Sequence, residues 1–180
     1  MSAVEWFASA VNEMVIWGSI PYKEEAIDAI EAIHRGTDFA RDAMCACTSR
    51  DKGRCACLAL RALYEAECTV SSVIATMGDP GMYPVYRDAV WNDGPACEAS
   101  RFVWDAVLYV AGYRLAEAED IYLRCMARAR ETGSDIDSEW AEGACECLDD
   151  VRFDAHVLQS CAGVEIDDRA LSIVDGWCRS

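Results

Sequence analysis

Apolar residues recur every three or four positions along most of the chain, the spacing typical of amphipathic α-helices. Near the N-terminus the pattern runs from Val4 to Val15, and Gly18 and Pro21 are expected to end this helix. Further helices are predicted at about 26–33, 38–47, 60–77, 96–130, 138–148, 151–161 and 168–177, with a short helical turn at 85–90. No segment combines β-branched residues with period-two alternation, so no sheet is expected. The sequence therefore predicts an all-α single domain, residues 1–180, of about seven to eight helices.

Glycine and polar clusters set the expected boundaries between these helices. Gly36 is expected to stop the second helix, and the polar segment Thr48–Gly53 is expected to form a turn. Pro95 suits the first position of the longest helix, because proline fixes a helical φ and lacks only an N–H that has no partner there. Gly133 is expected to separate that helix from the next one.

Residues 102–113 carry apolar side chains around the whole helical circumference, and only Asp105 interrupts them. A helix that is apolar on every side must be covered by neighbours. We therefore expect this segment to be the central helix of the bundle, with the other helices packed around it. Asp105 is expected to lie on a polar seam or to be buried with a partner, in a structural role.

The composition narrows the classes of partner. Apolar residues make up 53% of the 180 residues, enough for one buried core, and the formal net charge is -16. Such an acidic chain repels nucleic-acid phosphates and anionic lipid headgroups. Neither a secretory signal nor an apolar run long enough to cross a bilayer is found, so a cytoplasmic protein without membrane insertion is expected.

The chain contains eleven cysteines, an odd number that does not favour a disulfide framework in a reducing compartment. Most are expected to be reduced thiols that pack as small apolar side chains. Cys45 and Cys47, followed by Cys55 and Cys57, offer four thiolates for a zinc or copper site. Residues two apart on a helix point about 200° apart, so both pairs would have to leave helical geometry to converge. A metal-binding bundle is kept as an alternative function.

No set of residues suggests catalysis. The chain has two histidines, His34 and His156, and neither belongs to an H-E-x-x-H motif. Cys161 follows His156 by five residues, a poor helical register for a nucleophile and its base. A P-loop and a glycine-rich dinucleotide turn are both missing. We therefore assign no catalytic residue and no cofactor, and we expect a binding protein and not an enzyme.

Four segments, in order, resemble the homology motifs of the Bcl-2 family. They are the N-terminal helix 7–22, the segment 58–67 with Leu60 and Arg61, the segment 85–94 that reads VYRDAVWNDG, and the segment 140–145 with Trp140 and Gly143. Pro95 stands where the family's first motif has an arginine, while Tyr64 and Glu65 replace the glycine and aspartate of the third. Such departures resemble divergent viral members of the family, in particular poxvirus-like inhibitors of apoptosis or innate immune signalling.

This resemblance implies a Bcl-2-like bundle in which amphipathic helices leave an apolar groove for a partner helix or a signalling adaptor. The groove residues that it implies are Leu60, Leu63, Tyr64, Tyr86, Val90 and Trp91. The alternative is that these residues are simply core. A further alternative function is a toxin-neutralising immunity protein, because an acidic surface suits a basic toxin.

Overall fold

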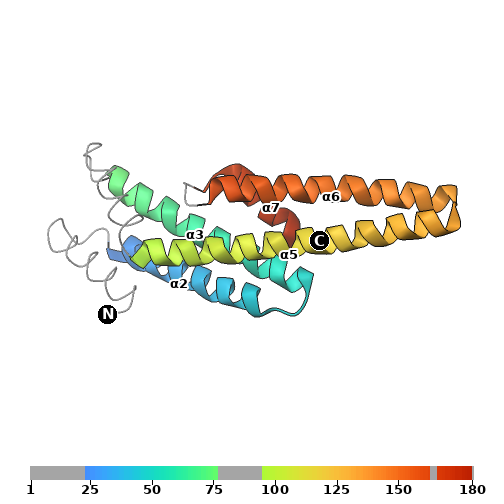
Figure 1. The fold of residues 1–180 in the computed structure, drawn as a ribbon. Coiled ribbons are helices and arrows are strands. Elements are labelled where there is room, and N and C mark those ends of the chain that lie inside the picture. The colour runs from blue at the N-terminus through green and yellow to red at the C-terminus, as the bar shows by residue number, and fades with distance from the viewer. Residues whose placement is uncertain (1–22, 77–94, 163–165, 180) are drawn as a thin grey trace.

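The computed structural model describes residues 23–76, 95–162 and 166–179, and these ranges form helices without any strand (Figure 1). The helices are α2 (Lys23–Cys45), α3 (Ser49–Thr76), α5 (Pro95–Thr132), α6 (Asp135–Cys161) and α7 (Asp168–Arg179). The all-α prediction is confirmed. The expected helix at 4–15 and the helical turn at 85–90 lie outside the described residues.

The described ranges hold fewer and longer helices than the glycine pattern predicted. α2 continues through Gly36, where a helix end was expected. A Cβ at Gly36 would lie 3.2 Å from the backbone oxygen of Ala59 and 3.5 Å from the Cβ of Ala62. This glycine therefore allows α2 and α3 to approach closely and does not break the helix. α6 likewise continues through 149–150, so one helix replaces the two that were predicted.

The polar segment expected as a turn is mostly the first turn of α3 instead. The hydroxyl of Thr48 accepts a hydrogen bond from the backbone N–H of Asp51 at 3.0 Å, and it donates to the Asp51 carboxylate at 2.7 Å. This cap gives a hydrogen-bond partner to an amide that has none within the helix. The negative carboxylate also interacts favourably with the positive, N-terminal end of the helix dipole. Gly53 lies inside the helix, against Trp177 of α7.

α5 runs through the whole molecule and packs on α2, α3 and α6. Its buried residues in the core are Val103, Trp104, Ala106, Val107, Val110 and Ala111. The prediction that residues 102–113 have no solvent-exposed side was wrong, however. Asp105, Tyr109, Gly112 and Tyr113 are exposed, and their spacing of four, seven and eight residues places them on one face. Tyrosine can pack its ring and still keep its hydroxyl in water, which explains how this apolar segment tolerates an exposed face.

The two tyrosines on this face cover a buried lysine. Lys52 is only 5% exposed, and its Nζ lies 4.9 Å from the ring centre of Tyr109 and 5.2 Å from that of Tyr113. The ammonium group also donates to the Tyr109 hydroxyl and to the backbone oxygen of Met44, each at 3.4 Å. Aromatic faces and oxygen acceptors thus replace part of the water that the cation loses on burial.

We call the helices around the core cluster the body, and beyond it α5 and α6 continue side by side as an antiparallel pair (Figure 1). No residue between Ala111 and Leu158 belongs to the buried core cluster of the described residues, and we call residues 112–157 the arm. Buried or half-buried positions alternate at spacings of four and three, as in a coiled coil: 111, 115, 118, 122, 125 and 129 on α5, and 137, 141, 144, 148, 151 and 155 on α6. Gly133 ends α5 as predicted, with a φ of 60°.

The C-terminal helix α7 packs on α3 and, less extensively, on α6. The Asp167 carboxylate caps it by accepting the backbone N–H of Ala170 at 2.9 Å. Ala170, Val174 and Trp177 are buried, which places one apolar stripe of this helix in the core. None of the described helices is both long enough and apolar enough to cross a membrane.

Candidate functional site

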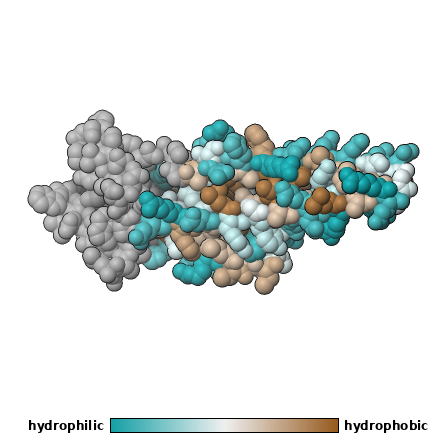
Figure 2. Space-filling model, in the orientation of Figure 1, coloured by the Kyte–Doolittle hydropathy of each residue, from teal (hydrophilic) through white to brown (hydrophobic). Residues whose placement is uncertain are grey.

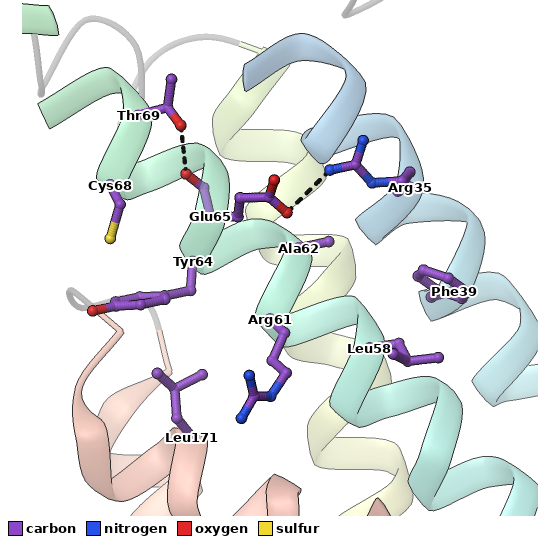
Figure 3. Close-up of a pocket in the computed structure, with 10 residues that line it drawn as sticks. All are labelled: Arg35, Phe39, Leu58, Arg61, Ala62, Tyr64, Glu65, Cys68, Thr69 and Leu171. Atoms are coloured by element: carbon purple, nitrogen blue, oxygen red, sulfur yellow. Dashed lines mark hydrogen bonds and ion pairs between the residues drawn. The ribbon is translucent and has the colours of Figure 1, made fainter. Parts of the chain in front are cut away.

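The outer surface of α3 carries an open hollow of about 610 Å³, bordered by α2 and α7 (Figure 3). Its lining residues are Arg35, Phe39, Leu58, Arg61, Ala62, Tyr64, Glu65, Cys68, Thr69 and Leu171. Tyr64 and Arg61 project from α3 toward Leu171 of α7, while Phe39 comes from α2 on the opposite side. The thiol of Cys68, as a hydrogen-bond partner, raises the pKa of Tyr64.

The charges around this hollow are paired. Arg61 holds Asp175 of α7 through two hydrogen bonds, Nε to Oδ1 at 2.6 Å and Nη2 to Oδ2 at 2.5 Å. Arg35 of α2 pairs with Glu65 of α3 at 3.0 Å. Both arginines are therefore engaged by carboxylates of the protein, and the two pairs tie α2 and α7 to α3.

Acid should weaken the attachment of α7 to α3. The hydrogen bonds from Arg61 hold the pKa of Asp175 below its ordinary value of 3.8. A carboxyl whose pKa is lowered by folding stabilises the protein above its unfolded pKa, and this contribution is lost as the pH falls through the folded pKa. We expect Asp175→Asn to lower the thermal midpoint at pH 7 and to have a smaller effect at pH 3, below the ordinary pKa of 3.8. Thermal unfolding of both proteins at the two pH values measures this, and an equal effect at both would contradict it.

Of the six groove residues implied by the family resemblance, the structure describes Leu60, Leu63 and Tyr64, and these three do not line one surface. Tyr64 lines the hollow, but Leu60 and Leu63 are 0% and 2% exposed and belong to the core. The side of α3 that carries them faces the other helices, so neither leucine is a groove wall in this structure. Tyr86, Val90 and Trp91 lie outside the described residues.

The two described segments that carry the resemblance are separated in space. Segment 58–67 lies on α3 in the body, whereas segment 140–145 lies in the arm, near the start of α6 (Figure 1). The other two segments, 7–22 and 85–94, fall on residues that the structure does not describe. The two described segments therefore do not share one surface.

The four cysteines proposed for a metal do not converge. Cys45 and Cys47 are exposed at the end of α2 and beyond it, Cys55 is half-buried, and Cys57 is buried in α3. Burial, together with the carboxylates of Asp42 and Asp51, raises the pKa of the Cys55 thiol. Within the described ranges, no group of three or more cysteine, histidine or acidic side chains is arranged to hold a metal ion.

The arm exposes large apolar side chains that the sequence analysis did not select as a surface. Trp140 is 70% exposed and Ile136 is 65% exposed. Tyr113, Ile121, Leu123 and Phe153 are also exposed on the arm. Figure 2 shows apolar surface interrupting the hydrophilic surface of this part of the molecule. Two packed helices leave much of their circumference open, and such exposure in a folded protein often marks a binding surface.

On α6 four exposed residues form a stripe of apolar or small side chains. Positions 136, 140, 143 and 147 lie on one side of the helix, next to the row that packs on α5. Gly143 lies between Trp140 and Cys147, and a Cβ there would meet nothing within 4 Å. The stripe is therefore shallow at its centre, and another backbone could approach closely there. We call Ile136, Trp140, Gly143 and Cys147 the arm stripe.

Carboxylates border the arm stripe. The part of α6 in the arm carries eight acidic residues and one arginine, Arg152. Arg152 pairs with Glu119 of α5 at 3.2 Å and with Asp149 at 3.6 Å. Among the residues that the structure describes, Glu139 and Glu146 form no ion pair, and with Asp150 they follow one another at helical spacing beside the stripe. The surface around the exposed tryptophan is therefore strongly negative.

Comparison with protein-family models, with curated proteins and with solved structures gives no significant match to this chain.

Proposed function

We propose that this chain is a protein-binding module that uses its arm to receive a basic, amphipathic helix of a partner protein. The observation that carries the proposal is the exposure of Trp140, one helical turn from Ile136, which is also exposed. Tryptophan is among the residues that contribute most to binding at protein interfaces. A solvent-exposed tryptophan beside an exposed isoleucine is costly to hydrate unless a partner covers both.

The geometry of the arm favours a helical partner. A third helix laid along the arm stripe would convert the two-helix pair into a three-helix bundle, with Gly143 allowing close approach. Burying Trp140 and Ile136 would contribute about 1.5–3 kcal/mol for each side chain. Ordering of the partner and lost freedom of motion oppose this gain, so weak binding is expected, with a dissociation constant on the order of 0.1 mM.

The charge of the arm favours a basic partner over a second copy of the same chain. Two copies, each with a formal net charge of -16, would bring like charges together around the stripe. Lysines or arginines on a partner helix could instead pair with Glu139 and Glu146. A basic helix thus satisfies both the apolar stripe and its acidic border.

A synthetic helix of leucine and lysine, labelled with a fluorophore, provides a probe for this surface. Fluorescence anisotropy should show saturable binding to the wild-type chain. The double variant Ile136→Ser/Trp140→Ser should bind at least about tenfold more weakly, a loss of about 1.4 kcal/mol. As a matched control, Met44→Ser removes an exposed apolar side chain of the body and should leave the affinity unchanged.

Three kinds of result would contradict the proposal. The first is failure of the wild-type chain to bind the probe, or equal binding by the double variant. The second is equal binding of a serine and lysine peptide with the same charge, which would reduce the effect to electrostatic attraction. The third is self-association of the wild type that the double variant loses, which would make a second copy the occupant.

A relation to viral Bcl-2-like inhibitors of apoptosis or innate immune signalling stays a prediction from sequence motifs, as does a cytoplasmic location. The proposed binding of a helical segment is compatible with that relation, but it depends on the arm stripe and not on the predicted groove. In the immunity-type alternative, the same acidic surface would bind a basic toxin.

A further inference from the structure

Two cysteine side chains face each other where α7 packs against α3. The thiol of Cys57 donates to the carboxylate of Asp175 at 3.6 Å, and Asp175 lies one turn before Cys178. The thiol of Cys178 in turn donates to the backbone oxygen of Arg54 at 3.9 Å, and Arg54 lies one turn before Cys57. Each thiol therefore donates a hydrogen bond to a residue of the other helix, and that residue lies one helical turn before the other cysteine.

The backbones of the two helices approach closely at this level. A Cβ added at Gly53 would lie 3.0 Å from the Cβ and 3.5 Å from the backbone oxygen of Trp177. Gly53 is one turn before Cys57, and Trp177 directly precedes Cys178. A disulfide requires its two Cβ atoms to lie within about 3.5–4.5 Å, a distance that only closely packed helices reach.

The two thiols differ in access and in acidity. Cys178 is exposed, whereas Cys57 is 1% exposed. Burial, followed by interactions with Cys178 and Asp175, raises the pKa of the Cys57 thiol to about 12. Cys57 is therefore a poor first nucleophile, because the thiolate is the reactive form. The exposed Cys178 is the side chain that a reagent in solution meets first.

We propose that Cys57 and Cys178 form a reversible disulfide on reaction with a small disulfide such as oxidised glutathione. The Cys178 thiolate attacks one sulfur of the reagent and displaces a glutathione thiolate, which gives a mixed disulfide on Cys178. The sulfur of Cys57, after losing its proton, then attacks the Cys178 sulfur and displaces the second glutathione. Two protein thiols are oxidised by two electrons, and one glutathione disulfide is reduced to two thiols that take up the two protons.

This bridge would join the C-terminal helix covalently to α3. It would fix the wall of the hollow that α7 supplies through Leu171, and it would close a loop of most of the chain. Closing so long a loop restricts the unfolded chain, so we expect the thermal midpoint of the oxidised protein to rise by on the order of 10 °C. This inference is independent of the arm and of the function proposed for it.

Peptide mapping of the full chain after treatment with oxidised glutathione tests the bridge. Mass spectrometry should detect a peptide that links Cys57 to Cys178, and a reducing agent should abolish it. The Cys147→Ser variant removes an exposed cysteine of the arm and should give the same link. In Cys178→Ser the link must vanish and Cys57 should stay free to alkylation after denaturation.

Two outcomes of the mapping would overturn the inference. In one, Cys178 of the wild type carries glutathione while Cys57 remains a free thiol, which would mean that the second exchange does not occur. In the other, Cys178 is linked to a different cysteine, such as the neighbouring Cys55. Both outcomes are measured on the wild-type protein, so neither depends on whether a variant folds.

Discussion

Replacement of Leu60 by alanine is expected to destabilise the protein by about 2–5 kcal/mol, because the side chain is fully buried and its removal leaves a cavity. Leu60 belongs to the same core cluster as Leu63, Val103 and Val107. Denaturant unfolding followed by circular dichroism measures the change in the free energy of unfolding.

The same experiment distinguishes a core residue from a groove residue. Tyr64, four residues along α3, lines the open hollow and is half-buried. Tyr64→Ala should therefore cost clearly less than Leu60→Ala. If the two variants were equally stable, or if Leu60→Ala had no effect on unfolding, the position of Leu60 in the core would be wrong.

Replacement of Gly53 by valine should be the most damaging change at the contact between α3 and α7. A Cβ at this position already meets the Cβ of Trp177 at 3.0 Å, and the two methyl groups of valine need further space. The Cβ of Trp177 is attached directly to the backbone of α7, so the whole of α7 would have to move. Overpacking of this kind costs about 1–3 kcal/mol.

Gly176 supplies the matched control, because it lies in α7 and a Cβ there meets nothing within 4 Å. Gly176→Val should change stability by no more than about 0.5 kcal/mol. Alkylation gives a second readout: Cys57 should react faster in Gly53→Val than in the wild type, because displacement of α7 uncovers it. Equal stability of the two valine variants would contradict the close packing of these helices.

Helical periodicity was sufficient to predict the fold class and the positions of most described helices, but not their boundaries. Gly36 and Gly53 were interpreted as signs of a helix end or a turn. In the structure both lie inside helices at points where another helix comes close. Glycine favours both situations, and the sequence around it does not tell which one applies. Gly133, which has a positive φ, is the glycine that ends a helix as expected.

The apolar segment of α5 shows why an exposed face was missed. Tyr109 and Tyr113 were counted as apolar, yet they lie at the surface above Lys52. Lys52 itself was assigned to a polar turn and is instead buried. Both errors have one cause. The tyrosines cover the lysine through a contact between residues at least 57 positions apart, and local patterns in the sequence do not reveal such a contact.

The arm stripe was present in the sequence as a second apolar row on α6. Ala141, Ala144, Leu148 and Val151 repeat as a coiled-coil row. Ile136, Trp140 and Cys147 form a second row beside it. One apolar row suffices to pack a helix pair, so a second row could have indicated a further surface. The hollow beside α3 could not be predicted in the same way, because it depends on how α2 and α7 lie against α3.

Nuclear magnetic resonance of the tryptophan indole N–H groups tests the proposed binding surface most directly. The signal of Trp140, assigned by its loss in Trp140→Phe, should shift progressively as the leucine and lysine helix is added. The signals of the buried Trp104 and Trp177 should move little. A titration in which the peptide binds while the Trp140 signal stays unchanged would show that the arm stripe is not the binding surface.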